Sequence, residues 1–207
     1  MPSADDIAAW DAEADTFDEP VDHGLHDPAA RRAWRELLLG VLPWPPARVA
    51  DLGCGTGTGT LSVLLAENGF QVEGVDFSPR MVELAERKAA GVQGVRVTQG
   101  DAFEPPLRAA SYDVILCRHV LWAMPDPAVA LARWIRLLAP GGRLVLVEGR
   151  WSNGAGLSAE QTLRLVEATG RAAELTRLVD ARFWGAETQD DRYLVVSPTG
   201  EPQADDR

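Results

Sequence analysis

The stretch Asp51-Leu52-Gly53-Cys54-Gly55-Thr56-Gly57-Thr58-Gly59 decides the fold of this chain of 207 residues. It places four glycines at alternate positions, after a short apolar segment at 48–52 and before a helical pattern at 58–68. Glycine allows a backbone to turn tightly and to approach a ligand closely. The free N–H groups at the start of the following helix attract a negatively charged ligand group. We therefore interpret the stretch as a strand, a ligand-binding turn and a helix.

Strand and helix patterns alternate outward from this turn. The expected strands are 48–52, 71–75, 95–97, 112–117, 143–148, about 173–179 and 192–197, and the expected helices are 58–68, 79–90, 127–138 and 158–169. Such alternation predicts βαβ crossovers and a mainly parallel sheet, whereas the loop between the last two strands predicts an antiparallel C-terminal edge hairpin. The sequence thus predicts an α/β fold with a doubly wound, Rossmann-like, seven-stranded sheet.

The whole chain, 1–207, is expected to form a single domain, because this length suits one full core and is short for two. Within it we expect an N-terminal helical lid at 1–46, with helices over 5–17 and 28–42, and a Rossmann-like core at 47–197. Trp10 and Phe17 repeat at helical spacing in the lid, so they either cover a ligand or pack in the core. The polar tail at 198–207 is predicted to be disordered.

The formal net charge of −11 is concentrated at the two ends of the chain. Residues 1–30 hold nine acids and no Lys or Arg, residues 187–207 carry −4, and residues 31–186 carry +2. A protein that binds a phosphate backbone needs a basic face, so we expect no nucleic-acid partner. No apolar run approaches the ~20 residues of a membrane-spanning helix, so we expect no membrane either.

Two further features of composition indicate the compartment and exclude one chemistry. The acidic N-terminus lacks the basic and apolar regions of a secretory signal, and the two cysteines form no CxxC motif, so we expect a cytoplasmic protein. Lys88 is the only lysine and lies in ERKAA, so a Walker A loop, which needs a lysine after its glycines, is excluded.

Acidic residues follow the second and third expected strands, at the sheet edge where a doubly wound fold binds its ligand. Asp76, 19 residues after Gly57, can accept bonds from both hydroxyls of a ribose; the alternative is a helix N-cap, for which Ser78 before Pro79 is better placed. Asp101 either accepts a bond from an exocyclic amine or merely forms a turn.

Five motifs together resemble those of a known family. They are DLGCGTG (51–57), GVDFSP (74–79), QGDAFEPP (99–106), SYDVILCRHVLWAMPDP (111–127) and RLLAPGGRLVLVE (136–148). In this order and spacing they resemble the class I S-adenosylmethionine (SAM)-dependent methyltransferases, of the small-molecule type similar to the ubiquinone/menaquinone C-methyltransferases. The resemblance covers about residues 47 to 150 and says little about the substrate.

The resemblance implies SAM as the cofactor, S-adenosylhomocysteine (SAH) as its product, and roles for five residues at the methionine end. Gly53, Gly55 and Gly57 would let the turn hold the methionyl group, and Asp51 would orient the turn and the ammonium group. Cys117 would offer its backbone carbonyl to the ammonium group, with no task for its thiol.

At the adenosine end the resemblance implies four more roles. Asp76 would bind the ribose diol, and Phe77 would lie beside the adenine. Asp101 would accept a bond from the adenine amine, with the N–H of Ala102 beside the ring.

The family's acceptor site lies beyond the fourth and fifth strands, under the N-terminal helices. There His119, which titrates near neutrality, is a candidate base, and His23 on the lid is a second. Trp122 stands where related sequences often have histidine, which predicts an aromatic pocket. Arg118 and Arg150 are candidate substrate contacts for an acidic acceptor; pairing with Asp or Glu is the alternative we favour.

The function implied is in-line transfer of the SAM methyl group to an O, N or C nucleophile of a small molecule, with proton removal assisted by His119. No metal is expected, since the sequence has no HExxH motif and only three histidines. The alternatives are an NAD(P)-dependent oxidoreductase, which the missing GxGxxG disfavours, and a non-catalytic SAM-binding module. A monomer or homodimer is expected.

Overall fold

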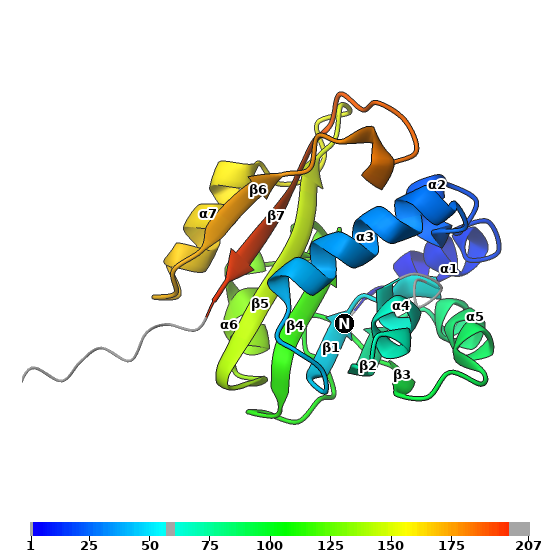
Figure 1. The fold of residues 1–207 in the computed structure, drawn as a ribbon, viewed down its shortest axis with the longest axis horizontal. Coiled ribbons are helices and arrows are strands. Elements are labelled where there is room, and N and C mark those ends of the chain that lie inside the picture. The colour runs from blue at the N-terminus through cyan, green and yellow to red at the C-terminus, as the bar shows by residue number, and fades with distance from the viewer. Residues whose placement is uncertain (1, 57–60, 199–207) are drawn as a thin grey trace, which may run out of the picture.

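The computed structural model describes residues 2–56 and 61–198 of the chain. Within them, seven strands form one sheet in the order β3-β2-β1-β4-β5-β7-β6 (Figure 1). The strands are β1 (Arg48–Leu52), β2 (Gln71–Asp76), β3 (Val95–Gln99), β4 (Tyr112–Arg118), β5 (Leu138–Arg150), β6 (Glu174–Arg177) and β7 (Asp191–Ser197). Strand β7 runs antiparallel to both β5 and β6, and the other pairs are parallel. The predicted mainly parallel sheet with an antiparallel C-terminal edge pair is confirmed.

The strand order reverses between β1 and β4, which are neighbours although two strands separate them in the chain. In a doubly wound sheet this reversal leaves a crevice beyond the carboxyl ends of the two strands. The segments that follow β1, β2 and β4 therefore meet at one edge of the sheet, and they carry most of the predicted site residues.

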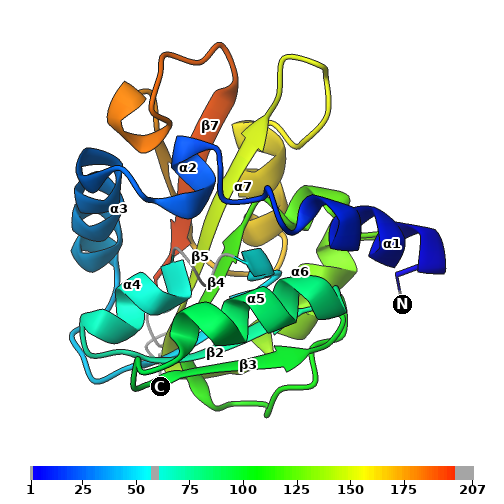
Figure 2. The same cartoon turned by 90° about the vertical axis from the view of Figure 1, so that its right-hand side faces the viewer.

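Helices cover both faces of the sheet. They are α1 (Ala4–Glu13), α2 (Val21–Gly24), α3 (Pro28–Val41), α4 (Leu61–Glu67), α5 (Pro79–Ala89), α6 (Pro127–Ile135) and α7 (Ala159–Glu167), with short 3-10 helices η2 (Leu121–Ala123) and η3 (Ala181–Phe183). Figure 1 shows α3 in front of the sheet and α6 behind it, and Figure 2 shows α1 beside α5, with which it is in contact. None of the described helices is long and apolar enough to cross a membrane.

Alternation along the strands builds one apolar core on each face. In β4, Val114 and Leu116 belong to the core under α3 and α4, whereas Ile115 and Cys117 belong to the core under α6 and α7. Successive side chains of a strand point to opposite faces, so a central strand of a doubly wound sheet is apolar throughout. The last four residues of the segment YDVILC, 114–117, have this pattern, and all four are inaccessible to solvent.

Several boundaries differ from the predicted ones. The helix expected over 5–17 ends at Glu13, because the chain turns there and brings Asp18 to the glycine turn. Strand β5 begins at Leu138 rather than at 143, because Leu138 pairs with Tyr112 before a register shift around Pro140-Gly141-Gly142. Residues 58–60 of the predicted helix, Gly57, and the tail beyond Pro198 lie outside the described residues.

Candidate active site

Asp76, the last residue of β2, organises the start of the site. Its carboxylate is buried and accepts two backbone hydrogen bonds, from Gly55 N (2.7 Å) and from Ser78 N (2.9 Å). Burial raises the pKa of Asp76 above its ordinary value, while these N–H donors oppose the rise. As predicted, the N-cap of α5 is Ser78, whose hydroxyl accepts a bond from Met81 N at 3.0 Å. Asp76 therefore joins the glycine turn to the start of α5.

The glycine turn needs glycine for two physical reasons. Gly53 and Gly55 adopt positive φ angles of 69° and 58°, which side chains other than glycine rarely tolerate. A Cβ atom on Gly53 would also lie 2.4 Å from the side chain of Val120. Below the turn, Asp51 is buried and accepts a bond from the Ser62 hydroxyl at 2.6 Å. Burial raises the pKa of Asp51 to about 6.

A cavity of about 280 Å³ opens at the carboxyl ends of β1, β2, β3 and β4. Eight of the predicted site residues line it: Gly53, Gly55, Asp76, Phe77, Asp101, Ala102, His119 and Trp122. Asp101 also accepts a bond from Phe103 N at 2.8 Å, so it forms a turn and faces the cavity at once. Trp10 and Phe17 of the N-terminal segment also line it.

A smaller cavity of about 50 Å³ shares Phe17, Gly53 and His119 with the larger one. It brings together three more predicted residues, Asp51, Arg118 and His23. Of the remaining predicted residues, Gly57 lies outside the described residues and Arg150 is exposed outside both linings. The side chain of Cys117 is buried in the core under α6, and the predicted contact of its backbone carbonyl stays a prediction. The Arg118 guanidinium lies 4.6 Å from the centre of the Trp34 ring.

His119 follows β4 directly and has an unusual conformation. Its φ angle is +57°, its N–H donates to Val147 O (2.8 Å), and its carbonyl accepts from Trp122 Nε1 (2.9 Å). Its Nε2 is shielded from solvent and has no hydrogen-bond partner among the described residues. Burial, followed by the cationic Arg118 and Arg192, lowers the pKa of His119 well below 6.5. The imidazole is therefore neutral near pH 7, with one nitrogen able to accept a proton.

The acidic lid is attached to the site by contacts that the sequence did not reveal. Asp11 accepts a bond from the Ser78 hydroxyl (2.5 Å), and Asp18 accepts one from the Thr56 hydroxyl (2.6 Å). Lys88 of α5 pairs with Asp18 and also donates to Thr56 O at 3.2 Å. No local sequence pattern indicates these contacts, because Lys88 lies 70 residues from Asp18 and 32 from Thr56.

His23 belongs to the roof of the site. Its ring stacks on Phe17 with centroids 4.5 Å apart, and its Nδ1 lies 3.0 Å from Phe17 O. The Phe17 ring in turn lies over Gly55, at 3.4 Å from the position of a Cβ atom there. His23 thus holds the aromatic cover above the glycine turn.

Comparison with known proteins assigns the domain. Residues 50–146 match the family described as a methyltransferase domain. The chain is 40% identical over 121 residues to a demethylmenaquinone methyltransferase of Deinococcus radiodurans, covering 56% of this chain and 49% of that protein. It is 41% identical over 127 residues to an uncharacterized 37.1 kDa protein in a transposon of Streptomyces fradiae, covering 60% of this chain and 36% of that protein. The chain therefore spans half or less of these relatives.

Solved structures agree on the fold. A methyltransferase in complex with the Haloferax volcanii Trm112 activator superposes with a TM-score of 0.71 at 20% identity, covering 97% of this chain and all of that one. The [4+2]-cyclase SpnF gives 0.70 at 20% identity, with 82% and 81% covered. A geranyl diphosphate methyltransferase gives 0.67 at 19% identity, with 82% and 77% covered. The family match identifies residues 50–146 as a methyltransferase domain, and the solved structures, at 20% identity or less, agree with this chain in fold.

Proposed function

We propose that the protein transfers the methyl group of SAM to an oxygen, nitrogen or carbon nucleophile of a small molecule. The observation that carries this proposal is the convergence of Gly55, Asp76, Asp101 and His119 on one cavity, each from the end of a different strand. The demethylmenaquinone methyltransferases among the relatives support the same reaction class.

The residues of the larger cavity suit the adenosine half of SAM. Asp76 is a bidentate acceptor for a ribose diol, because each of its oxygens has a second lone pair beyond the backbone bond described above. Phe77 and Ala102 provide apolar surface for a planar base, and Asp101 provides an acceptor for its amine. The smaller cavity continues from Gly53 toward Asp51 and Arg118. A carboxylate and a guanidinium there match the ammonium and carboxylate groups of a methionine moiety.

The chain's own residues would orient the acceptor, exclude water and take up a proton. SAM, when bound, supplies a methyl group already activated by its sulfonium. Trp10 and Phe17 cover the cavity and exclude water from it. The neutral His119 accepts the proton of an acceptor O–H or N–H group as the methyl group is transferred. His23 is the weaker candidate for this step, because it lines only the smaller cavity and its Nδ1 lies 3.0 Å from Phe17 O. The proposed acceptor contact is Trp122 at the cavity wall. Arg118 lines the smaller cavity assigned to the methionine moiety, and Arg150 is exposed outside both cavities, so neither is proposed as an acceptor contact.

Two measurements test the proposal. Calorimetry with SAM and with SAH should show stoichiometric binding of both, and a panel of phenols, alcohols, amines and carbon acids should yield a product heavier by one methylene. His119→Asn should lower the rate for acceptors that must lose a proton and leave SAH affinity unchanged. Tight binding of NADH without SAM binding would favour an oxidoreductase. SAM binding without any methylated product would favour a binding module.

A further inference from the structure

Glu148, near the end of β5, is a completely buried carboxyl group. It follows the alternation of β5, so its side chain lies on the same face as Leu146 and Cys117, beside Leu121. Burial raises the pKa of Glu148 to about 8. A carboxyl group is rarely buried completely unless it is paired or hydrogen-bonded, because burial without partners is costly.

The hydrogen bonds of Glu148 are directed at one turn. Its Oε1 accepts from Val120 N at 3.0 Å and from Leu121 N at 2.7 Å. These are the two residues that directly follow His119. The thiol of Cys117 lies 3.8 Å from the same oxygen, and Oε2 has no hydrogen-bond partner among the described residues.

The conformation of His119 requires this support. A positive φ such as the +57° of His119 costs a non-glycine residue about 1–3 kcal/mol. The conformation persists only where surrounding contacts offset this cost. Here Val147 O binds the N–H of His119, and Glu148 binds the next two N–H groups. Two consecutive residues of β5 thus anchor three consecutive N–H groups of the turn.

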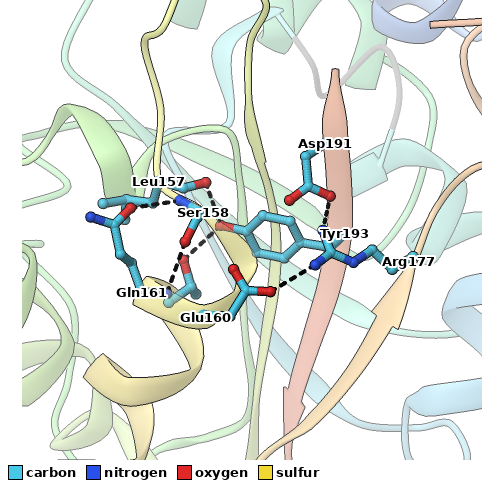
Figure 3. A network of polar contacts seen from close by, with 8 residues as sticks. Leu157, Ser158, Glu160, Gln161, Arg177, Asp191 and Tyr193 are labelled. Atoms are coloured by element: carbon cyan, nitrogen blue, oxygen red, sulfur yellow. Dashed lines mark hydrogen bonds and ion pairs between the residues drawn. The ribbon is translucent and has the colours of Figure 1, made fainter. Parts of the chain in front are cut away.

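The neighbour of Glu148 in the sheet does not compete for its bonds. Tyr193 of β7 pairs directly with Glu148, but its hydroxyl is bonded to Thr162 Oγ1 (2.7 Å) and to Leu157 O (2.9 Å). Figure 3 shows this separate network, in which the Tyr193 ring points from β7 toward the start of α7. Tyr193 therefore does not bond to the Glu148 carboxyl, whose Oε1 accepts from the N–H groups of the His119 turn.

We propose that Glu148 is a positioning residue that holds the turn at 119–121, and with it the His119 side chain at the junction of the two cavities. The role is indirect, because Glu148 lines neither cavity. The inference rests on the proposed function for the use of His119, but its geometric part can be tested without any acceptor.

The experiment compares Glu148→Gln, which keeps an oxygen in place of Oε1, with Glu148→Leu, which fills the space without an acceptor. The protein is labelled with ¹⁵N-histidine, and the three histidines are separated by assigning His119 with His119→Asn. In the wild type and in Glu148→Gln, His119 should stay neutral across the neutral range. In Glu148→Leu its pKa should move toward the ordinary 6.5, as the ring becomes less buried and moves away from the charged groups that face it, Arg118, Arg192 and His23.

Tyr193→Phe is the matched control. It removes two buried hydrogen bonds from the same face and leaves the Glu148 carboxyl intact. It should lower stability without changing the His119 resonances. An equal change of the His119 resonances in Tyr193→Phe and Glu148→Leu would overturn the proposal, since the role of Glu148 would then be packing alone. Unchanged resonances in Glu148→Leu would overturn it as well.

Amide hydrogen exchange covers the case in which Glu148→Leu does not fold. The amides of Val120 and Leu121 should be protected in the wild type and in Glu148→Gln, and exchange as fast as that of open loops would contradict the proposal. SAH affinity, measured alongside, should be the same in the wild type and in Glu148→Gln. Absent SAH binding in the wild type would refute the proposed function, while the His119 resonances would still report on Glu148.

Discussion

The acidic residues of this protein fall into two regions with opposite physical settings. In the lid seam, which we define as Asp11, Asp15 and Asp18 with Ser78, Arg80 and Lys88, the acids contact cations or hydroxyls near the surface. In the buried acid row, which we define as Asp51, Asp76 and Glu148, the acids accept bonds from backbone N–H groups or a serine hydroxyl.

The two settings differ in how much it costs to break their contacts. Exposed ion pairs contribute little and are screened by salt, so the pairs of Arg80 with Asp15 and Glu83 should add less to the lid seam than the partly buried pair of Lys88 with Asp18. A buried carboxyl group that loses its partners is costly, so the buried acid row holds one geometry. The acids behind the net charge of −11 therefore include both surface acids and buried acids, whose contacts differ in strength.

The largest expected effect concerns the pH dependence of stability. The pKa of Glu148 is about 8 in the folded protein, against an ordinary 4.5. Between these values the folded state holds a proton that the unfolded state has released, so stability falls as the pH rises from about 4.5 to about 8. The free energy of unfolding should decrease by about 3–5 kcal/mol over this range.

Urea unfolding at about pH 5 and about pH 9 measures this decrease. Glu148→Gln should remove most of it, and the remainder should come from Asp51 and Asp76, whose pKa values are also raised. The same decrease in Glu148→Gln as in the wild type would show that Glu148 does not hold the proton.

The next effect is on cofactor affinity. Asp76→Ala leaves the N–H groups of Gly55 and Ser78 without their acceptor and removes the proposed ribose contact. Affinity for SAH should fall by about a hundredfold or more, as calorimetry would show. Asp113→Ala is the control, since Asp113 accepts a bond from Arg48 N at the start of β1, away from the site. A loss below about threefold would count against Asp76 as a ligand.

A smaller effect is expected from Lys88→Gln. Lys88 joins the lid to the glycine turn through Asp18 and Thr56, and burial lowers its pKa to about 8. SAH affinity should fall about fivefold, and in the wild type it should weaken both with salt and as the pH rises through 8. Arg31→Gln, which breaks an exposed pair with Glu67 outside both cavities, should leave SAH affinity unchanged. Equal losses in the two variants would remove any special role of the lid seam.

The smallest effect belongs to Arg80→Gln. Arg80 pairs with Asp15 and Glu83 at 2.7 and 2.6 Å, but these acids are largely exposed. SAH affinity should change by less than about twofold, because solvent screens such pairs. A loss as large as that of Lys88→Gln would mean that burial does not separate strong from weak contacts in the lid seam.

The sheet could be predicted because its signals are local: alternating strand and helix patterns, and glycines after a strand. The same local chemistry distinguished Asp76, which lines the cavity, from Ser78, which caps α5. The contacts of the lid seam could not be predicted, because Lys88 lies 70 residues from Asp18 in sequence. The hydrogen bonds of Glu148 to Val120 and Leu121 could not be predicted either, because these partners lie 28 and 27 residues away in sequence. The division into a lid at 1–46 and a core at 47–197, the ligand roles and the monomer or homodimer stay predictions.

Lys88 has one more consequence, which concerns covalent chemistry. It is the only lysine of the 207 residues, so reagents that acylate side-chain amines have a single lysine to attack. That lysine is partly shielded by Asp18, at the contact between lid and glycine turn. A dye attached there would report on the contact between the N-terminal segment and the glycine turn, and a support coupled there would immobilise the protein at that contact.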